Sequence, residues 1–283
     1  MSSGNGAAPG PPPGSGVVPA LGDAALLLRA EGVTKNYGPS IVLRGLDLQI
    51  ARGEVLALVG DNGAGKSTFI KILSGFHAPT SGTLYWEGRA TVLTSPTQAR
   101  ALGIETVYQD LALVNDLTVA QNMFLGREPI KRVLGVLPLT DAKAMRLRTR
   151  EFLDQVGIRL ASVDSLVRDL SGGQRQSIAV ARAMQSQPKL LIMDEPLAAL
   201  GVREGAHVLD LVQEIRRRRE VSIILIVHNY SQIFQVCDRI NFLFAGEIVL
   251  DVATSAITEE ELIRMVKAGL GAQAAARPAG SGS

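Results

Sequence analysis

Residues 60–67, GDNGAGKS, have the types and spacing needed to bind phosphate. They consist of a Gly, four further residues and then Gly-Lys-Ser, which is the pattern of a phosphate-binding P-loop. The glycines allow successive amide N–H groups to point inward, and a helix that follows adds the positive end of its dipole. Lys66 can reach the β- and γ-phosphates, and the Ser67 hydroxyl is an oxygen ligand suited to Mg²⁺. The motif therefore predicts a site for ATP or GTP, and the alternative is a glycine-rich turn that carries Lys-Ser by chance.

The segments on both sides of this motif favour the P-loop interpretation. Residues 54–59, EVLALV, are typical of a buried strand, and residues 68–73 begin a helix with one apolar face. A strand, a loop and a helix in this order are what the motif requires. Another continuously apolar strand, residues 189–193, delivers Asp194 and Glu195 at its carboxyl end. Carboxylates near a P-loop are suited to anchor Mg²⁺ and to orient or activate a water molecule.

Two further features indicate chemistry. A pair of glycines lies in LSGGQ, residues 170–174, where a helix over residues 175–187 begins. Adjacent glycines are costly in a helix, so they indicate close approach by another group, such as a second phosphate-binding edge, unless they form a plain N-cap and turn. His228 follows an apolar strand at residues 221–227. An isolated His is commonly a core or surface residue, but a strand end alongside the two carboxylates favours a place in the site.

Composition and charge limit the class of protein. The chain has 283 residues, of which 46% are hydrophobic and 20% charged, enough to bury the core of one globular domain. We expect this domain at residues 24–268, between flexible tails at 1–22 and 269–283, the first without the basic residues of a secretory signal. No apolar run approaches the roughly 20 residues that cross a bilayer. The net charge of +2, with scattered basic residues, argues against nucleic-acid binding. The single Cys237 excludes an intrachain disulfide and agrees with a reducing cytoplasm.

A small β lobe is predicted before and after the P-loop. Short β-type segments over residues 26–50, with a turn at residues 38–40, predict an antiparallel sheet that a later strand at 83–87 joins. Tyr37 precedes the turn and can stack on a nucleotide base or pack in the β core. The position of Tyr37 in the sequence, taken alone, favours packing in the β core over stacking on a base.

A helical lobe is predicted next, at about residues 111–175. A strand at residues 103–107 precedes Gln109, and helical patterns follow at 111–127 and 140–156 with an irregular segment at 129–138 between them. The apolar residues of this lobe form either its own core or a groove for a partner. Towards the end of the chain, the sequence predicts a hairpin at residues 240–251 and a last helix opened by a capping box of Thr258 and Glu261.

Together these residues resemble the landmarks of the ATP-binding cassette (ABC) ATPases. The resemblance covers about residues 26–268, and the P-loop combined with LSGGQ is highly specific for this family. The landmarks fall in the family's order: Tyr37 (A-loop), residues 60–67 (Walker A), Gln109 (Q-loop), residues 170–174 (signature), residues 190–195 (Walker B) and His228 (H-loop). The resemblance implies an α/β fold with a P-loop NTPase core, an antiparallel β lobe and an inserted helical lobe.

The resemblance also implies an ATPase with ATP and Mg²⁺ as cofactors. Glu195 would polarise the attacking water, with His228 and Gln109 as further catalytic residues, and Mg²⁺ would be held by Ser67, Gln109 and Asp194. In a head-to-tail dimer, the signature helix of one subunit would cover ATP held by the P-loop of the other. The nucleotide-binding set implied is Tyr37, Gly60, Asp61, Asn62, Gly63, Ala64, Gly65, Lys66, Ser67 and Thr68, with Ser171, Gly172, Gly173 and Gln174.

Stretches such as GDNGAGKST and LSGGQRQSIAVARA look most like the ATPase subunits of bacterial carbohydrate importers of the fructose and ribose type. The similarity implies a peripheral ATPase on the cytoplasmic face of the inner membrane that drives uptake of a solute. The solute we expect is a monosaccharide. Its partners would be a membrane permease, a separate solute-binding protein and a second ATPase subunit, either another copy or a different cassette. The alternatives are a soluble ABC ATPase acting on nucleic acid or ribosomes and an exporter or lipid-transport ATPase. Gly201 departs from the family pattern because it stands where the D-loop usually has Asp, a residue tied to communication between the two sites.

Overall fold

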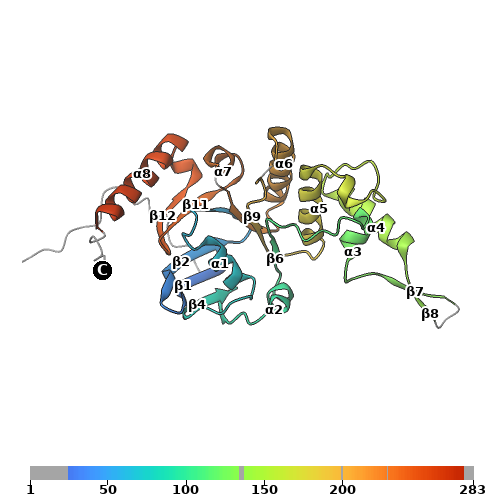
Figure 1. Ribbon diagram of the computed structural model, residues 1–283, viewed down its shortest axis with the longest axis horizontal. Coiled ribbons are helices and arrows are strands. Elements are labelled where there is room, and N and C mark those ends of the chain that lie inside the picture. Colours follow the sequence, from blue (N-terminus) through green and yellow to red (C-terminus); the bar gives the residue numbers. More distant parts are fainter. Residues whose placement is uncertain (1–24, 134–136, 199, 228, 277–283) are drawn as a thin grey trace, which may run out of the picture.

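The computed structural model describes residues 25–133, 137–198, 200–227 and 229–276. Within them, helices pack around a large central sheet, a smaller sheet covers part of it, and a lobe extends to one side (Figure 1). The central sheet has the strand order β12-β11-β3-β10-β9-β6. Its strands are β3 (Val55–Val59), β6 (Ile104–Val107), β9 (Leu190–Asp194), β10 (Ser222–Ile226), β11 (Arg239–Phe244) and β12 (Glu247–Ala253).

The central sheet is parallel except at one edge, where β12 pairs antiparallel with β11. All five residues of β3 and of β10 are buried, which is why every position except Ser222 is apolar rather than alternating with polar residues. Because parallel strands end at the same edge, the loop after β3 and the carboxylates at the end of β9 emerge on one side of the sheet. The predicted strand, loop and helix setting of the P-loop is confirmed, with α1 (Lys66–Leu73) following the loop.

Different elements cover the two faces of this sheet. On one face, α1 and the smaller sheet share a core in which Phe69 and Ile70 of α1 are buried with Leu56 and Leu58 of β3. On the other face, α5 (Gly172–Met184), α6 (Val202–Arg218), α7 (Tyr230–Val236) and α8 (Glu259–Ala276) supply a second core. The smaller sheet has the order β2-β1-β4-β5, formed by β1 (Leu26–Tyr37), β2 (Ser40–Ala51), β4 (Ser81–Trp86) and β5 (Arg89–Thr91). It is antiparallel, so the predicted β lobe is confirmed.

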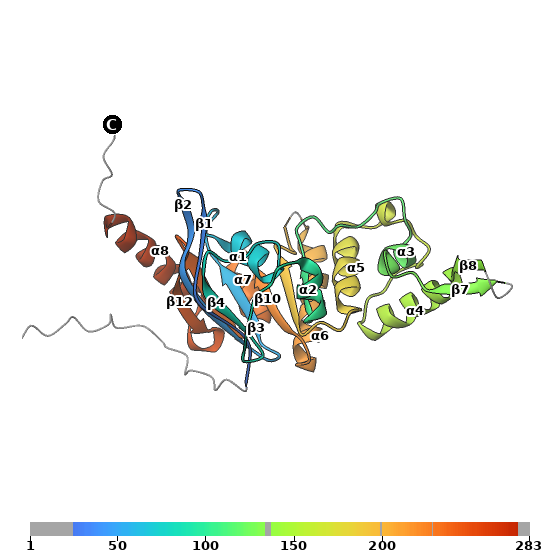
Figure 2. The ribbon, with the colours of Figure 1, turned by 90° about the horizontal axis from the view of Figure 1, so that it is seen from below.

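The helical lobe extends away from both sheets in both views (Figure 2). It contains α3 (Val119–Phe124), α4 (Ala142–Gln155) and the signature helix α5, and α2 (Pro96–Ala101) lies before it along the chain. Its own core includes Met123, Met145, Leu153 and Ile178, all at most 3% exposed. Since Ile178 belongs to α5, the signature helix joins the lobe to the central sheet.

Two predictions within the lobe are wrong. Residues 111–127 do not form one helix, because α3 spans only Val119–Phe124. The buried side chain of Asn122 bonds to the backbone of Val114 and Leu117, which satisfies polar groups of the irregular segment and holds it against α3. Residues 129–138 do not form an irregular connection either, because β7 (Ile130–Val133) and β8 (Leu137–Thr140) make an antiparallel hairpin.

The carboxyl-terminal part of the chain follows the sequence pattern up to its last helix. The predicted hairpin is β11 and β12, and Thr258 with Glu261 makes the predicted cap, with Glu261 accepting from the Thr258 N–H at 2.8 Å. Helix α8 continues to Ala276, so residues 269–276, expected in a flexible tail, are helical. Among the described residues, none of the helices has the length and apolar character of a membrane span.

Candidate functional site

The P-loop, residues 60–65, connects β3 to α1 in a conformation that needs glycine. Gly65 is the N-cap of α1 with φ 113°, a left-handed value that residues with side chains rarely adopt. A Cβ on Gly60 would lie 2.2 Å from the carbonyl oxygen of Leu243, and a Cβ on Gly65 would lie 2.7 Å from Leu43 Cδ2. The loop is therefore packed against β11 and β2, which holds its backbone in place.

Lys66 folds back over this loop. Only 6% of the residue is exposed, and its ammonium donates to the carbonyl oxygens of Gly60 (2.6 Å) and Asp61 (3.0 Å). Burial lowers the pKa of the Lys66 amine, and the carboxylates of Glu195, Asp61 and Asp194 oppose that shift. The P-loop lysine is therefore within electrostatic reach of Glu195, predicted to be catalytic, and of Asp194, predicted to hold Mg²⁺.

The two acids lie at the carboxyl end of β9, as predicted. Asp194 ends the strand and pairs with Ile226 of β10, and both acids are half-buried. Glu195 has φ 50°, in the left-handed region, and its N–H donates to the carbonyl of Ile226 (3.1 Å). A non-glycine residue in this region stores about 1–3 kcal/mol of strain, and such residues cluster at active sites. The sharp turn carries the Glu195 side chain off the end of the strand.

The predicted residues Asp61, Asn62, Gln109 and Glu195 line one open hollow of about 590 Å³. Gln109 reaches it because β6, two residues before it, pairs directly with β9. Ser67 in the first turn of α1 is exposed. The hollow therefore joins side chains of the P-loop to the carboxylate and the amide that follow two neighbouring strands.

Tyr37 does not pack in the β core. It ends β1 with 42% of its surface exposed, its ring meets the edge of His77 at a centroid distance of 5.7 Å, and Lys35 Nζ lies 5.3 Å from its centroid. The core-packing interpretation is therefore wrong, and the ring has a face available for stacking.

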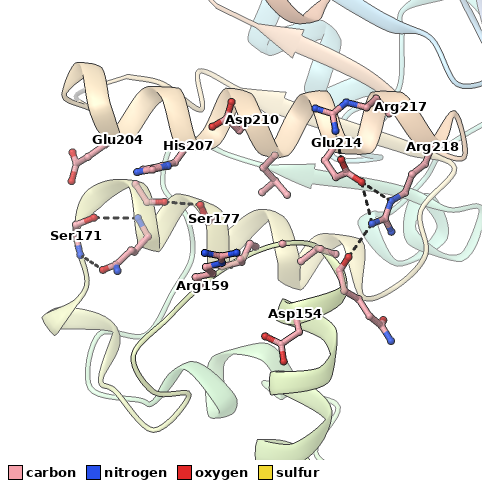
Figure 3. Close-up of a pocket in the computed structure, with 17 residues that line it drawn as sticks. Asp154, Arg159, Ser171, Ser177, Glu204, His207, Asp210, Glu214, Arg217 and Arg218 are labelled. Atoms are coloured by element: carbon pink, nitrogen blue, oxygen red, sulfur yellow. Dashed lines mark hydrogen bonds and ion pairs between the residues drawn. The ribbon is translucent and has the colours of Figure 1, made fainter.

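The signature residues form the first turn of α5. Ser171 is the N-cap, its Oγ accepts from the Gln174 N–H (3.3 Å), and Gln174 Oε1 accepts from the Ser171 N–H (3.0 Å). They line a different cavity of about 540 Å³, between α5, α6 and residues 154–159 (Figure 3). The P-loop helix α1 lies apart from α5 in both ribbon views (Figures 1 and 2). Within the described part of one chain, the structure does not bring the signature residues to the P-loop hollow.

Helix α6 explains Gly173 of the signature. A Cβ on Gly173 would lie 2.9 Å from Glu204 Cβ in α6, whereas a Cβ on Gly172 would lie 2.9 Å from Leu200 Cδ2, the end of a side chain just before α6. A glycine at position 173 therefore allows helices α5 and α6 of the same chain to approach closely. Backbone bonding by Gly201 first, and the Ser171 hydroxyl next, lower the pKa of the Glu204 carboxyl, which lies over the start of α5.

Two residues of this region were missed by the sequence interpretation. Glu204 had a usable signal, because Gly201 followed three residues later by Glu is the pattern of a helix start, and Glu204 does accept from the Gly201 N–H (3.4 Å). No signal in the sequence indicated Arg182, because it donates to the carbonyls of Leu111 and Ala112, some 70 residues earlier in the chain. His228, predicted to be catalytic, lies outside the described residues.

A parallel α/β sheet that carries a glycine-rich phosphate loop between its strand β3 and helix α1 defines a P-loop nucleotide-binding protein. Comparison with known proteins gives the family. The model of the family described as ABC transporter matches residues 43–198. The chain belongs to this family, as its sequence motifs predicted, and it is an ATP-binding cassette with ATPase activity.

Individual relatives agree with this assignment. The chain is 42% identical over 240 residues to the xylose/arabinose import ATP-binding protein XylG of Sulfolobus acidocaldarius, covering 85% of this chain and 93% of the relative. It is 46% identical over 218 residues to the fructose import ATP-binding protein FrcA of Rhizobium meliloti, covering 76% and 84%. The ribose import ATP-binding protein RbsA 1 of Rubrobacter xylanophilus is 40% identical over 240 residues, but the chain spans only 46% of its length.

Solved structures agree on the fold. CbiO1 of Clostridium perfringens, described as part of the ABC transporter complex cbiONQ, superposes with a TM-score of 0.70 at 29% identity and covers 86% of this chain and 94% of its own. A nucleotide-free ATP-binding cassette from an ABC transporter superposes with a TM-score of 0.72 at 23% identity, covering 86% and 95%. The predicted fold class is confirmed.

Proposed function

We propose that this chain is the ATP-hydrolysing subunit of an importer for a monosaccharide. The observation that carries the proposal is that Asp61, Asn62, Gln109 and Glu195 line one open hollow, with the Lys66 amine in electrostatic interaction with Glu195 and Asp61, which is an arrangement for phosphoryl transfer to water. The relatives named for import of xylose/arabinose, fructose and ribose support the solute class.

In this reaction the P-loop binds the triphosphate. The loop amides and the start of α1 supply donors to the phosphate oxygens, and Lys66 exchanges its bonds to the loop carbonyls for bonds to the β- and γ-phosphates. Tyr37 stacks on the adenine with its exposed ring. Asn62 and Gly63 complete the wall around the phosphates, and Thr68 follows Ser67 in the first turn.

The side chains near the hollow also suit Mg²⁺. Hard oxygen ligands are available from the exposed Ser67 hydroxyl, the exposed Gln109 amide and the half-buried Asp194 carboxylate. Among the residues that the structure describes, no group of three or more His, Cys, Asp or Glu forms a protein-only metal site, which fits a metal that is bound partly by nucleotide oxygens. When bound, Mg²⁺ neutralises phosphate charge.

Glu195 is the group we assign to the attacking water. Its carboxylate accepts a hydrogen bond from the water and orients it towards the γ-phosphorus, while Lys66 stabilises the charge that develops on the phosphate. His228, by its place after β10, assists in positioning the water and the γ-phosphate.

The signature helix acts on a second copy of the chain. Because Ser171 and Gly173 line a cavity of their own, they meet a γ-phosphate only if that phosphate is held by another subunit. Val202, 94% exposed at the start of α6, is an apolar residue that such a subunit would cover. ATP then joins two copies head to tail, and hydrolysis releases them.

The remaining partners are a membrane permease and a separate solute-binding protein, with the cassette peripheral on the cytoplasmic face of the membrane. The helical lobe offers apolar surface for the permease, since Ile130, Leu137 and Leu139 of the β7–β8 hairpin are each more than half exposed.

The test is reconstitution with the permease that copurifies with the full chain. We expect ATP hydrolysis in proteoliposomes to rise when the binding protein carries D-xylose, D-fructose or D-ribose and to stay low when it is empty. The matched control is Lys66→Ala in the same complex. Hydrolysis that is stimulated by RNA or DNA, with no membrane protein bound, would contradict the proposal.

A further inference from the structure

The side chain of Arg182, in the last turn of the signature helix α5, holds the segment that carries Gln109. Its Nη1 donates to the carbonyl of Ala112 (2.8 Å) and its Nη2 to the carbonyl of Leu111 (3.0 Å). A planar guanidinium can bond two neighbouring carbonyls at once, whereas an ammonium acts as a single point charge. Two bonds from one rigid group fix both the position and the orientation of this short backbone segment.

The segment that receives these bonds has no regular secondary structure, and the bonds from Asn122 hold it further along, at Val114. Residues 108–116 contain no helix or strand, and Ala112 has φ 49°, in the left-handed region. Within it, the Ala112 N–H bonds at 3.4 Å to the side chain of Asp110, which belongs to the same segment. Gln109 is exposed at its start, directly after β6. The guanidinium therefore anchors the segment two and three residues beyond the amide that lines the hollow.

Arg182 lies in a cluster of charged side chains. Burial lowers its pKa, Arg127 and Arg100 act in the same direction, and the carboxylate of Glu105 opposes them. Glu105 on β6 is 8% exposed and lies 3.7 Å from Arg127 and 3.8 Å from Arg100. Glu105 is thus shared by Arg127 and Arg100, while Arg182 donates to the backbone two and three residues after Gln109.

We propose that Arg182 is a positioning residue for Gln109, and that it links the signature helix directly to the segment that places this amide in the nucleotide hollow. The inference rests on the proposed function, because it assumes that Gln109 acts on Mg²⁺ and the attacking water. Helix α5 carries Ser171 at its start and Arg182 near its end, so a movement of the signature helix moves the Gln109 segment as well.

The experiment is a double-mutant cycle on the purified full chain with ATP and Mg²⁺. The four proteins are the wild type, Arg182→Lys, Gln109→Ala and the variant with both changes, compared by kcat, KM for ATP and the Mg²⁺ concentration for half-maximal activity. Misplacing a catalytic group by about 1 Å costs on the order of 100-fold in rate, so we expect Arg182→Lys to lower kcat by about 10- to 100-fold with little change in KM. In the Gln109→Ala background we expect almost no further loss.

Controls separate positioning from stability. Arg146→Lys alters an arginine of the same lobe that pairs with Asp164 at the surface, and we expect its kcat to stay at the wild-type value. Arg182→Gln, which keeps one amide donor, replaces Arg182→Lys if the lysine variant does not fold, as judged by thermal unfolding.

The outcomes are distinct. If the lysine change lowers kcat by the same factor with and without Gln109, Arg182 acts elsewhere and the inference is overturned. If Gln109→Ala alone leaves kcat and Mg²⁺ dependence unchanged, the assignment of Gln109 fails, and with it both this inference and that part of the proposed function.

Discussion

Replacing Gly173 by Ala tests whether the signature glycine is set by helix packing. Gly173 lies in the first turn of α5, and its φ is not left-handed, so backbone conformation does not exclude alanine. In an exposed helix interior, Gly to Ala stabilises by about 1 kcal/mol. Here the new Cβ would lie 2.9 Å from Glu204 Cβ and 3.2 Å from both Glu204 Cα and its carbonyl oxygen.

The size of the effect follows from these distances. Carbon atoms in contact prefer a separation of about 3.5–4.0 Å, so the overlap is more than half an ångström. Two of the three atoms belong to the backbone of α6, so a side-chain rotation cannot relieve the overlap. Overpacking of this kind costs about 1–3 kcal/mol, which exceeds the helix-propensity gain. We expect Gly173→Ala to lower the free energy of unfolding by about 1–2 kcal/mol, and Tm by about 2–8 °C.

The assay is urea and thermal unfolding of the full chain followed by circular dichroism. The matched control is Gly205→Ala in α6, because a Cβ there meets only Leu197 Cδ2 at 3.9 Å. That substitution should raise stability by about 0.5–1 kcal/mol, so the two glycines respond with opposite signs. The packing argument is refuted if Gly173→Ala is as stable as the wild type while Gly205→Ala behaves as expected.

Further predictions concern the site and two buried groups. Glu195→Gln should bind ATP and close into pairs but hydrolyse about 100-fold more slowly, measured by phosphate release and by sedimentation, and normal turnover would remove Glu195 from its role. Lys66→Ala should weaken ATP binding about 10- to 100-fold in a fluorescent-nucleotide titration, and an unchanged affinity would count against the P-loop assignment. Burial raises the pKa of the Cys237 thiol, so it stays protonated and should react with iodoacetamide only after unfolding; rapid alkylation of the native chain would disprove its burial. Arg239→Ala leaves the buried Glu54 carboxylate without its partner at 3.0 Å and should cost about 3–5 kcal/mol in urea unfolding, a loss that a Glu54→Gln change in the same chain should reduce.

The P-loop motif and the acids at the end of β9 lie in short segments, so the sequence was sufficient to predict where they occur. The P-loop needs its glycines and Lys66 within eight residues, so the motif can be recognised directly in the amino-acid sequence. The acids after the apolar part of β9 and the largely apolar strands of a doubly covered sheet are likewise local signals, because burial on both faces favours apolar residues at successive positions. These features gave the fold class and the residues around the hollow.

The prediction of secondary structure from the sequence failed where the conformation of a segment depends on residues outside it. The β7–β8 hairpin was expected to be irregular because each strand has four residues and β8 contains Pro138, too little for a periodic signal. The length of α3 was overestimated because Asn122 satisfies the backbone of the segment before it, which the apolar pattern does not show.

By itself, then, the sequence determined that this chain has a P-loop between a parallel strand and a helix, and which acids lie at the end of another strand. Only the tertiary structure decided that a signature glycine faces α6, that Glu195 adopts a left-handed conformation, and that Arg182 holds the Gln109 segment. The physical reason is the range of the forces involved. The P-loop motif and the apolar strands are patterns of residues adjacent in the chain, whereas overlap, strain and hydrogen bonds between residues about 30 to 70 positions apart exist only after the chain has folded.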